Sequence, residues 1–459
     1  SAGSGIFLVI LFNRMAEEWR FENPLKANVE RARALRELLC KNFWGVDLNV
    51  PACPITCFIP YLALFDQLEP ADIWQLKKEL EREQGEQKVL PPLLAESGKD
   101  FKGSETPRVL EANFFRPDLP LPTDFHLVIG NPPWIGRGQE RDAEMEQWFD
   151  SKENPYLADA PKSAAARRAY FFPERQSAHG FMWKVPAHLR ADGRACLVLP
   201  TKVFMNERTN AFQAGWMNRF SLDHVIQLAD YSFLIFEEAD CPAVIARFTP
   251  HKPADQAVVL YDTPKVERTD PRHSLITVLP DDQKGLRLHE LLLGAQNKCA
   301  SVVWKQALWG TGRDVAFLHR LYRLPTLGDV AGDPDDETKR WAKGQGFQPF
   351  SEKRFKEDPK KYLRNVRLDT KPWWKSGQRL LEAENDQISL VVCEDDAPPQ
   401  AEIPSRLRRS FDEKLAQPPM VLVTQGFGKA AFCNFSVVFE HSIQSIAAKQ
   451  RGEIGRAHV

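Results

Sequence analysis

Hydrophobic and polar positions alternate with two different periods through the first half of the chain. Apolar residues recur at helical spacing over residues 5–18, 29–39, 54–68, 180–189 and 204–220. Short apolar runs typical of strands cover residues 43–48, 108–111, 125–129, 195–199, 225–226 and 242–248. Strands that alternate with helices indicate an α/β fold with a mostly parallel sheet. Between these elements, residues 79–87 predict a solvated charged stretch, and Asp192-Gly193 predicts a turn.

The sequence pattern changes after Pro250, where Pro, Gly and charged residues cluster and the alternation of predicted strands and helices becomes irregular. We therefore expect a first domain over residues 1–250, a connecting region over 251–300 and a second, mixed α/β domain over 301–453. Within the second domain, residues 339–379 carry 13 Lys and Arg against 4 Asp and Glu, with several Trp and Phe among them. This stretch therefore carries a strong local excess of positive charge in a chain that is otherwise close to neutral.

Composition excludes several classes of protein. The chain has 459 residues, 27% of them charged, and a net charge of −1, which argues against a disordered chain and against binding driven by overall charge. No apolar run reaches the roughly 18 residues of a membrane span. The eight cysteines are scattered, and only Cys53 and Cys57 are near neighbours, so we expect no disulfide scaffold and no metal site. Reduced thiols favour a cytoplasmic protein.

Two polar features mark the carboxyl-terminal side of the predicted sheet. Gly3-Ser-Gly5 stands at the head of the first helix, where glycines allow close backbone approach and the helix offers unpaired N–H groups. Asp47 ends the strand 43–48, and a carboxylate there can accept both hydroxyls of a nucleoside ribose. Taken alone, each feature is equally well explained as an ordinary turn or helix cap. Together they predict a nucleotide-like ligand.

The most specific motif is Asn131-Pro132-Pro133-Trp134, which follows the apolar strand 125–129. The prolines restrict the backbone and lack N–H groups, which leaves carbonyl acceptors to face a ligand. The Asn131 side-chain oxygen and the Pro132 carbonyl could accept both hydrogens of an exocyclic amino group. Trp134 offers a flat face on which a base can stack. The alternative is a rigid loop with a core tryptophan.

With these motifs the sequence resembles the N6-adenine DNA methyltransferases of the gamma arrangement, which occur in restriction–modification and phage-defence systems. Residues 1–8 are similar to the tail of that family's methionine-binding motif without its leading Asp-Pro, and residues 43–47 to the strand that holds the cofactor ribose. The resemblance continues through 109–114, which face the cofactor adenine, and 125–134, the catalytic motif. It implies a Rossmann-like sheet that binds S-adenosylmethionine, followed by a target recognition domain.

The resemblance also implies roles for individual residues. Asn131, Pro132, Pro133 and Trp134 form the catalytic loop, and Phe236 adds a second aromatic face for a flipped adenine. The implied cofactor-binding residues are Gly3, Gly5, Asp47, Asn113 and Phe114. The family usually has Asp where this chain has Asn113, so a neutral amide replaces a charged acceptor and should bind more weakly. The methyl group then passes directly to adenine N6 without a covalent enzyme intermediate.

The implied partner is double-stranded DNA with one adenine flipped out. We interpret the basic stretch as its phosphate-tracking surface, with these candidate DNA-binding residues: Lys353, Arg354, Lys360, Lys361, Arg364 and Arg367. The alternative is a solvated charged face. A dense content of aromatic residues argues against pure solvation, although some of these rings could form local core.

Two other functions share parts of this pattern. Methyltransferases that act on RNA or on protein glutamine carry a similar Asn-Pro-Pro-aromatic motif, and a catalytically silent DNA-recognition protein could retain the fold. At the ends, residues 1–5 have the character of a loop that follows a strand, so we expect a fragment that binds the cofactor poorly by itself. A nuclease domain or subunit could lie outside it. Residues 454–459 are a candidate non-native tail.

Overall fold

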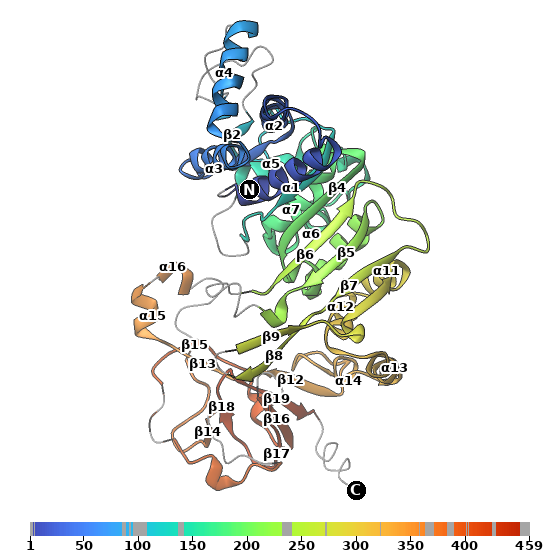
Figure 1. The fold of residues 1–459 in the computed structure, drawn as a ribbon. Coiled ribbons are helices and arrows are strands. Elements are labelled where there is room, and N and C mark those ends of the chain that lie inside the picture. The colour runs from blue at the N-terminus through green and yellow to red at the C-terminus, as the bar shows by residue number, and fades with distance from the viewer. Residues whose placement is uncertain are drawn as a thin grey trace. The chain divides into compact units, whose positions relative to one another are not determined.

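The computed structural model describes residues 3, 5–84, 89–90, 93–94, 108–135, 142–231, 241–270, 273–321, 323–357, 359–362, 371–382, 390–400, 402, 404–424 and 428–449 (Figure 1). It divides into two compact units, Ser1–Val315 and Ala316–Val459. The first unit runs past the expected boundary at residue 250, because two later strands pair into its main sheet. Within the described residues, no helix is long and apolar enough to cross a membrane.

The main sheet of the first unit has six strands in the order β10-β7-β5-β6-β4-β3. Their bounds are β3 Phe125–Gly130, β4 Leu189–Pro200, β5 Ser221–Gln227, β6 Ala243–Thr249, β7 Val258–Asp262 and β10 Gln283–Arg287. Strands β3 and β4 are parallel, as are β5 and β7, whereas β6 is antiparallel to both of its neighbours and β10 to β7. The α/β fold is therefore confirmed, but the sheet is mixed rather than mostly parallel.

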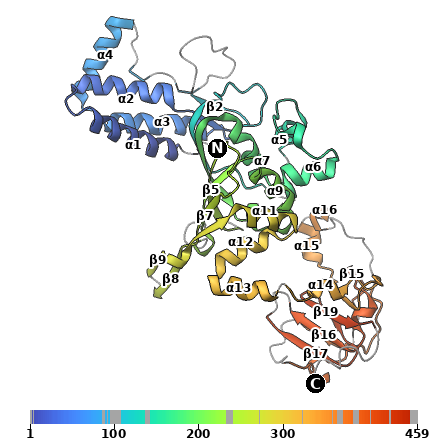
Figure 2. The ribbon, with the colours of Figure 1, turned by 90° about the vertical axis from the view of Figure 1, so that its right-hand side faces the viewer.

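A separate parallel pair, β1 Gly45–Asp47 and β2 Val109–Glu111, lies in the same unit, with Asp47 opposite Glu111. Helices cover the strands; α1 packs on α3, and α2 packs on α4 (Figure 2). The helices of this unit are α1 Ile6–Glu22, α2 Asn28–Asn42, α3 Ala52–Asp66, α4 Pro70–Gln84, α5 Ala143–Asp150, α6 Ala164–Phe171, α7 Ser177–Lys184, α8 Lys202–Met205, α9 Asn210–Met217, α11 Leu288–Gln296 and α12 Ala300–Trp309. An antiparallel hairpin, β8 Lys265–Asp270 with β9 His273–Thr277, completes the unit.

Two local predictions differ from the structure. The predicted turn at Asp192-Gly193 lies inside β4, where the register against β3 shifts between Leu189 and Arg194. A Cβ on Gly193 would come within 2.5 Å of the Phe125 carbonyl oxygen, so the glycine permits this bulge. The predicted solvated stretch from residue 79 instead begins inside helix α4.

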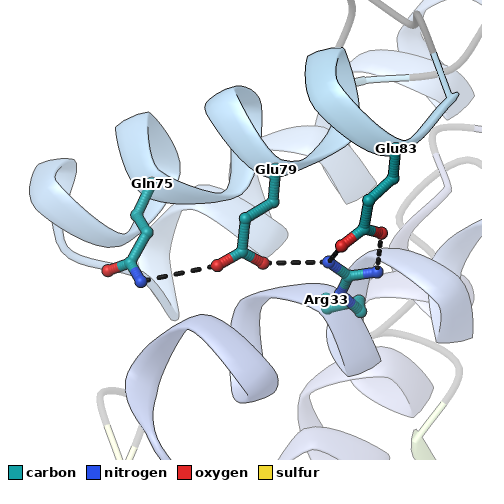
Figure 3. Close-up of polar contacts among 4 residues, drawn as sticks. All are labelled: Arg33, Gln75, Glu79 and Glu83. Carbon is teal, nitrogen blue, oxygen red and sulfur yellow. Dashed lines mark hydrogen bonds and ion pairs between the residues drawn. The ribbon is translucent and has the colours of Figure 1, made fainter.

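Ion pairs connect α4 to α2 (Figure 3). Some charged side chains of α4 are therefore paired with α2 and not only solvated. The Arg33 guanidinium on α2 donates to the Glu79 and Glu83 carboxylates at 2.9 and 2.7 Å. Gln75 extends the row by donating to Glu79. The Arg33 hydrogen bonds lower the pKa of the Glu83 carboxyl.

The second unit has its own sheet, in the order β11-β12-β19-β16-β17, and its own apolar core around Met420, Leu422 and Phe439. Helix α13 Gly312–Leu321 spans the division between the units. The remaining elements are α14 Leu327–Val330, β11 Ala331–Gly332, β12 Trp341–Gln345, β13 Gln348–Pro349, α15 Glu352–Glu357, α16 Pro359–Tyr362, β14 Leu380–Leu381, β15 Leu407–Arg409, β16 Met420–Thr424, β17 Ala430–Cys433, β18 Val438–Phe439 and β19 Ile443–Ala448.

Candidate active site

The predicted site residues follow the carboxyl ends of three strands in the first unit. Asp47 ends β1, Asn113 and Phe114 follow β2, and the Asn131–Trp134 loop follows β3. In α/β sheets, ligands bind at the carboxyl ends of the strands. Sequence periodicity therefore located these residues correctly with respect to the strands, although it did not reveal what each contacts.

Asp47 and Gly3 are brought together although they are far apart in sequence. The Gly3 N–H donates to Asp47 Oδ2 at 2.8 Å, and the Asn49 N–H donates to Oδ1 at 2.8 Å. The Thr56 hydroxyl on α3 donates to the Gly3 carbonyl at 2.6 Å, which fixes the loop from its other side. The carboxylate thus holds the glycine loop against the end of β1.

Gly5 occupies the N-cap of α1 in the left-handed region, with φ of 79°. A side chain there would be strained, and its Cβ would lie 3.1 Å from the Thr56 Cα. The glycine is therefore required by the turn into α1. The N–H groups in the first turn of an α-helix have no partner within the helix, so those of α1 can face an anionic or polar ligand.

These groups fit the nucleoside half of S-adenosylmethionine. A carboxylate has about four lone-pair positions, so a group such as Asp47, which accepts from the N–H groups of Gly3 and Asn49, has the chemistry to accept hydroxyl hydrogens as well. Asp47 is buried, which favours any hydrogen bond made to its charge. The fit rests on the chemistry of Asp47 and on its position at a strand end.

Asn113 has a local structural role in addition to its predicted one. Its Oδ1 accepts from the Phe115 N–H at 2.9 Å, and its Nδ2 donates to Asp142 Oδ1 at 2.9 Å. Asp142 in turn caps α5 by accepting from the Met145 N–H. The amide therefore ties the loop after β2 to the start of α5.

Phe114, next in the chain, is half-buried and stacks on Phe181 of α7, with ring centroids 5.4 Å apart and planes 7° apart. The Lys184 ammonium donates to the Phe114 carbonyl at 2.5 Å and lies over the rings of Phe114 and Phe115. Burial lowers the pKa of Lys184 to about 8. Lys184 was not predicted from sequence, and no motif marks it.

The Asn131–Trp134 loop alternates in exposure. Asn131 and Pro133 are exposed, Pro132 is buried and Trp134 is half-buried. Asn131 makes no hydrogen bond to any residue that the structure describes, so its amide can bind a ligand. This is the arrangement expected of an acceptor presented on a rigid loop.

Ser177, the first residue of α7, clamps this loop. Its hydroxyl donates to the Pro133 carbonyl and accepts from the Ile135 N–H at 3.1 Å. The Ser177 N–H donates to the Ile135 carbonyl at 2.9 Å, and the side chain is buried. Sequence reasoning missed this residue because the contact spans more than 40 positions; its only signal is a small polar residue at a helix start.

The remaining predicted site residues lie either on α15 and α16 of the second unit or outside the described residues. Phe236, Arg364 and Arg367 fall outside the described residues. Lys353 and Arg354 are exposed on α15, and Lys360 and Lys361 belong to α16, where their side chains are not described. In the described part of the chain, no three His, Cys, Asp or Glu side chains are grouped to hold a metal ion.

Aromatic residues of the basic stretch form local core in the second unit. Phe350, Phe355 and Tyr362 contact one another, with ring centroids 5.4–6.2 Å apart. The Arg406 guanidinium lies 3.6 Å from the Phe350 ring centroid. Trp374 is buried in the main core of that unit. These rings hold α15 and α16 in place and leave Lys353 and Arg354 at the surface.

The first unit has an acid at a strand end of its two-stranded sheet and Asn-Pro-Pro-Trp after a strand of its six-stranded sheet, and its α/β architecture agrees with the expected fold class. Residues 41–236 match the family described as Eco57I restriction-modification methylase, which confirms the resemblance to restriction–modification enzymes. No curated protein matches the chain.

Three solved structures illustrate the likeness. The type IIL restriction-modification enzyme MmeI, in complex with DNA, is 12% identical with a TM-score of 0.45; the alignment covers 98% of this chain and 56% of MmeI. The DNA-bound type ISP enzyme LlaBIII is 9% identical with a TM-score of 0.47, over 97% of this chain and 31% of that one. The EcoKI M protein is 15% identical with a TM-score of 0.34, over 59% and 45%. The chain thus spans about half the length of MmeI.

Proposed function

We propose that the first unit is the catalytic part of a DNA methyltransferase of a restriction–modification system, and that it methylates adenine at N6. The observation that carries the proposal is the exposed Asn131 at the end of β3, on a loop clamped by Ser177. The family match over residues 41–236 supports the class of enzyme.

In the proposed reaction, Asn131 Oδ1 and the Pro132 carbonyl accept the two N6 hydrogens of adenine. The amino lone pair is conjugated with the ring and is a poor nucleophile. Two acceptors draw the amino group towards tetrahedral geometry and expose this lone pair. Most of the rate enhancement then comes from positioning and electrostatics on a loop that does not have to reorganise.

The methyl donor is S-adenosylmethionine, which supplies an electrophilic sulfonium methyl group when bound. Asp47 would hold its ribose hydroxyls, and Phe114 would contact its adenine. The loop at Gly3 and Gly5 would carry the backbone close to the ligand. In this proposal, the end of β1, the loop after β2 and the loop at Gly3 and Gly5 together form the cofactor site.

DNA is the proposed substrate, with the adenine flipped out of the duplex and stacked on Trp134 and Phe236. Trp134 is half-buried, so part of its ring remains accessible. The exposed Lys353 and Arg354, together with Lys360, Lys361, Arg364 and Arg367, would contact phosphates.

Transfer of tritiated methyl groups to three acceptors tests the proposed substrate: duplex DNA, RNA of the same sequence and a glutamine-containing protein. The chain is assayed within the longest polypeptide that carries it. We expect label only in DNA. Label in RNA or protein would contradict the DNA assignment. Tight cofactor binding in calorimetry without transfer to any acceptor would indicate a silent recognition protein.

A further inference from the structure

Lys184, the last residue of α7, is the only lysine or arginine that is buried among the residues that the structure describes. It is 7% exposed. Its Nζ atom lies 5.0 Å from the ring centroid of Phe114, 5.4 Å from that of Phe115 and 5.7 Å from that of Trp148. The ammonium group is therefore surrounded by aromatic rings of the loop after β2 and of α5.

Stability does not account for a lysine at this position. No carboxylate of the described residues forms an ion pair with Lys184, and Glu144 and Glu153 attract it without forming one. Burial lowers the pKa of Lys184 to about 8, so its protonated form is less stable in the folded protein than in water. Replacing buried charges by apolar side chains of similar volume is often neutral or stabilising.

The hydrogen bond of Lys184 reaches the loop after β2. The ammonium donates to the Phe114 carbonyl at 2.5 Å. Asn113, the preceding residue, donates to Asp142, which caps the start of α5. Adjacent residues of the loop are thus held by two different helices. Of the two contacts, the one with Lys184 is the one that burying a charge makes costly.

Phe114 connects Lys184 to the cavity of the candidate site. Its ring lines a cavity of about 770 Å³ together with Phe181, His188 and Pro132, whereas Lys184 does not line it. The Phe114 ring stacks on Phe181 and contacts His188, with centroids 5.4 Å apart in both pairs. A shift of the Phe114 backbone therefore changes the wall of the cavity. Lys184 can act on a bound ligand through this wall rather than by contact.

We propose that Lys184 is a positioning residue for the cofactor: it holds the Phe114 carbonyl, and thereby the ring, where the ring contacts the purine of S-adenosylmethionine. This inference rests on the proposed function, which assigns the cofactor adenine to Phe114. A hydrogen bond that orders the loop reduces the entropy that cofactor binding would otherwise lose. Loss of the bond weakens binding of the nucleoside part and leaves the chemical step unchanged.

Lys184→Met, which keeps most of the side-chain length and removes the donor, tests the proposal in the longest polypeptide that carries the chain. We expect the dissociation constant and the KM for S-adenosylmethionine to rise by about tenfold. The turnover number at saturating cofactor should stay within about twofold of the wild type. The free energy of unfolding at neutral pH should not fall.

Lys265→Met is the matched control. Lys265 also donates to a carbonyl, that of Leu308 at 3.0 Å, and lies over the Trp309 ring, but it does not contact Phe114. Its substitution should change neither the dissociation constant nor the KM. If Lys184→Met and Lys184→Leu both failed to fold, the role would be structural and the proposal would be overturned.

5′-Methylthioadenosine, which carries the nucleoside of the cofactor without its amino-acid part, locates the effect. Lys184→Met should weaken its binding by the same factor as that of S-adenosylmethionine. If only S-adenosylmethionine bound more weakly, Lys184 would act on the other end of the cofactor, and the proposal would be wrong.

Phe114→Ala shows whether Lys184 acts through the ring. Adding Lys184→Met to Phe114→Ala should reduce cofactor affinity by less than about twofold further, because the ring that the lysine positions is absent. A full tenfold loss in the double variant would contradict the proposal.

The wild type separates this inference from the proposed function. A wild type that bound neither S-adenosylmethionine nor 5′-methylthioadenosine in calorimetry would contradict the proposed function, and this inference with it. Cofactor binding by the wild type that Lys184→Met left unchanged would overturn this inference alone.

Discussion

The two sheets of the first unit differ in the length of their hydrogen-bonded ladders, and each carries a different part of the candidate site. In the six-stranded sheet, long ladders join β3 to β4 and β4 to β6, and this part of the unit has a core rich in aromatic residues, including Trp183, Phe212 and Trp216. The other sheet has three residues in each strand and a more aliphatic core around Leu35, Leu39 and Leu64. Asn131 belongs to the first sheet and Asp47 to the second.

This comparison assigns two chemical roles, binding of the target base and binding of the cofactor, to different sheets. The sequence motifs alone do not make that distinction. The predicted target-base acceptor stands on the better supported sheet, where Ser177 fixes its loop. The predicted cofactor ligand, Asp47, stands on the smaller sheet. Changes on one side should therefore alter turnover, and changes on the other should alter cofactor affinity. The predictions below use substitutions that test this separation in the longest polypeptide that carries the chain.

Asn131→Ala should have the largest effect, because it removes an acceptor used in the transition state. We expect the turnover number to fall by about a hundredfold or more, with cofactor affinity in calorimetry unchanged. Asn131→Asp keeps an acceptor oxygen and should retain more activity. A fall of less than about tenfold, or roughly 1.4 kcal/mol of barrier, would contradict the catalytic assignment.

Ser177→Ala should lower turnover by about tenfold to a hundredfold, because the loop loses two of its three clamping hydrogen bonds. The cofactor dissociation constant should not change. Ser163→Ala is a matched control, since Ser163 caps α6 but does not contact the loop. Equal losses in both variants would indicate general destabilisation rather than loop positioning.

Asp47→Ala should weaken S-adenosylmethionine binding by about tenfold, as expected when hydrogen bonds to a charged acceptor are removed. DNA affinity should remain nearly unchanged. Asp118→Ala, which removes an exposed carboxylate paired with Arg116, serves as the control. An unchanged cofactor dissociation constant in calorimetry would remove Asp47 from the site.

The lowered pKa of Lys184 predicts that the free energy of unfolding depends on pH. Its pKa of about 8 in the folded protein is below the usual value, so the unfolded chain binds more protons between pH 8 and about 10.4. The folded state therefore gains stability as the pH rises through this window. Relative to Lys184→Met, the wild type should gain on the order of 2 kcal/mol between pH 7.5 and 9.5 in chemical unfolding. A constant difference between the two proteins would show that Lys184 titrates normally.

The smallest expected effect concerns DNA binding by the second unit. Lys353→Gln with Arg354→Gln should flatten the salt dependence of DNA affinity, by about 0.9 in log–log slope for each phosphate that the protein no longer neutralises. Lys41→Gln with Lys77→Gln, an exposed and a half-buried lysine of the first unit, is the control. If the slope stayed the same, these two cations would face solvent in the complex.

Sequence periodicity predicted the parts of the fold that depend on local pattern. Asp47 and Asn131 were expected at strand ends and are found there, because short apolar runs end where a polar residue begins. The direction of β6 could not be predicted, since an apolar strand has the same pattern in either direction. The first unit extends past residue 250 for a related reason: β7 joins the first sheet by pairing with β5, and composition does not record such a pairing.

Contacts between distant residues account for what the sequence did not reveal at the site. The partners of Ser177 and Lys184 lie 42–70 positions away, and both residues resemble ordinary helix positions. Asn113 was assigned to the cofactor by resemblance, whereas its local bonds to Phe115 and Asp142 depend on how α5 docks. The roles of Asn131, Asp47 and the basic residues stay predictions.

The identity of the methylated base tests the central claim most directly. Duplex DNA methylated with isotopically labelled S-adenosylmethionine is digested to nucleosides, which are separated and identified by mass spectrometry. The proposed function predicts N6-methyladenine in the wild-type product, and the role proposed for Asn131 predicts its loss in Asn131→Ala. Labelled N4-methylcytosine, or N6-methyladenine at equal yield from both proteins, would contradict the account.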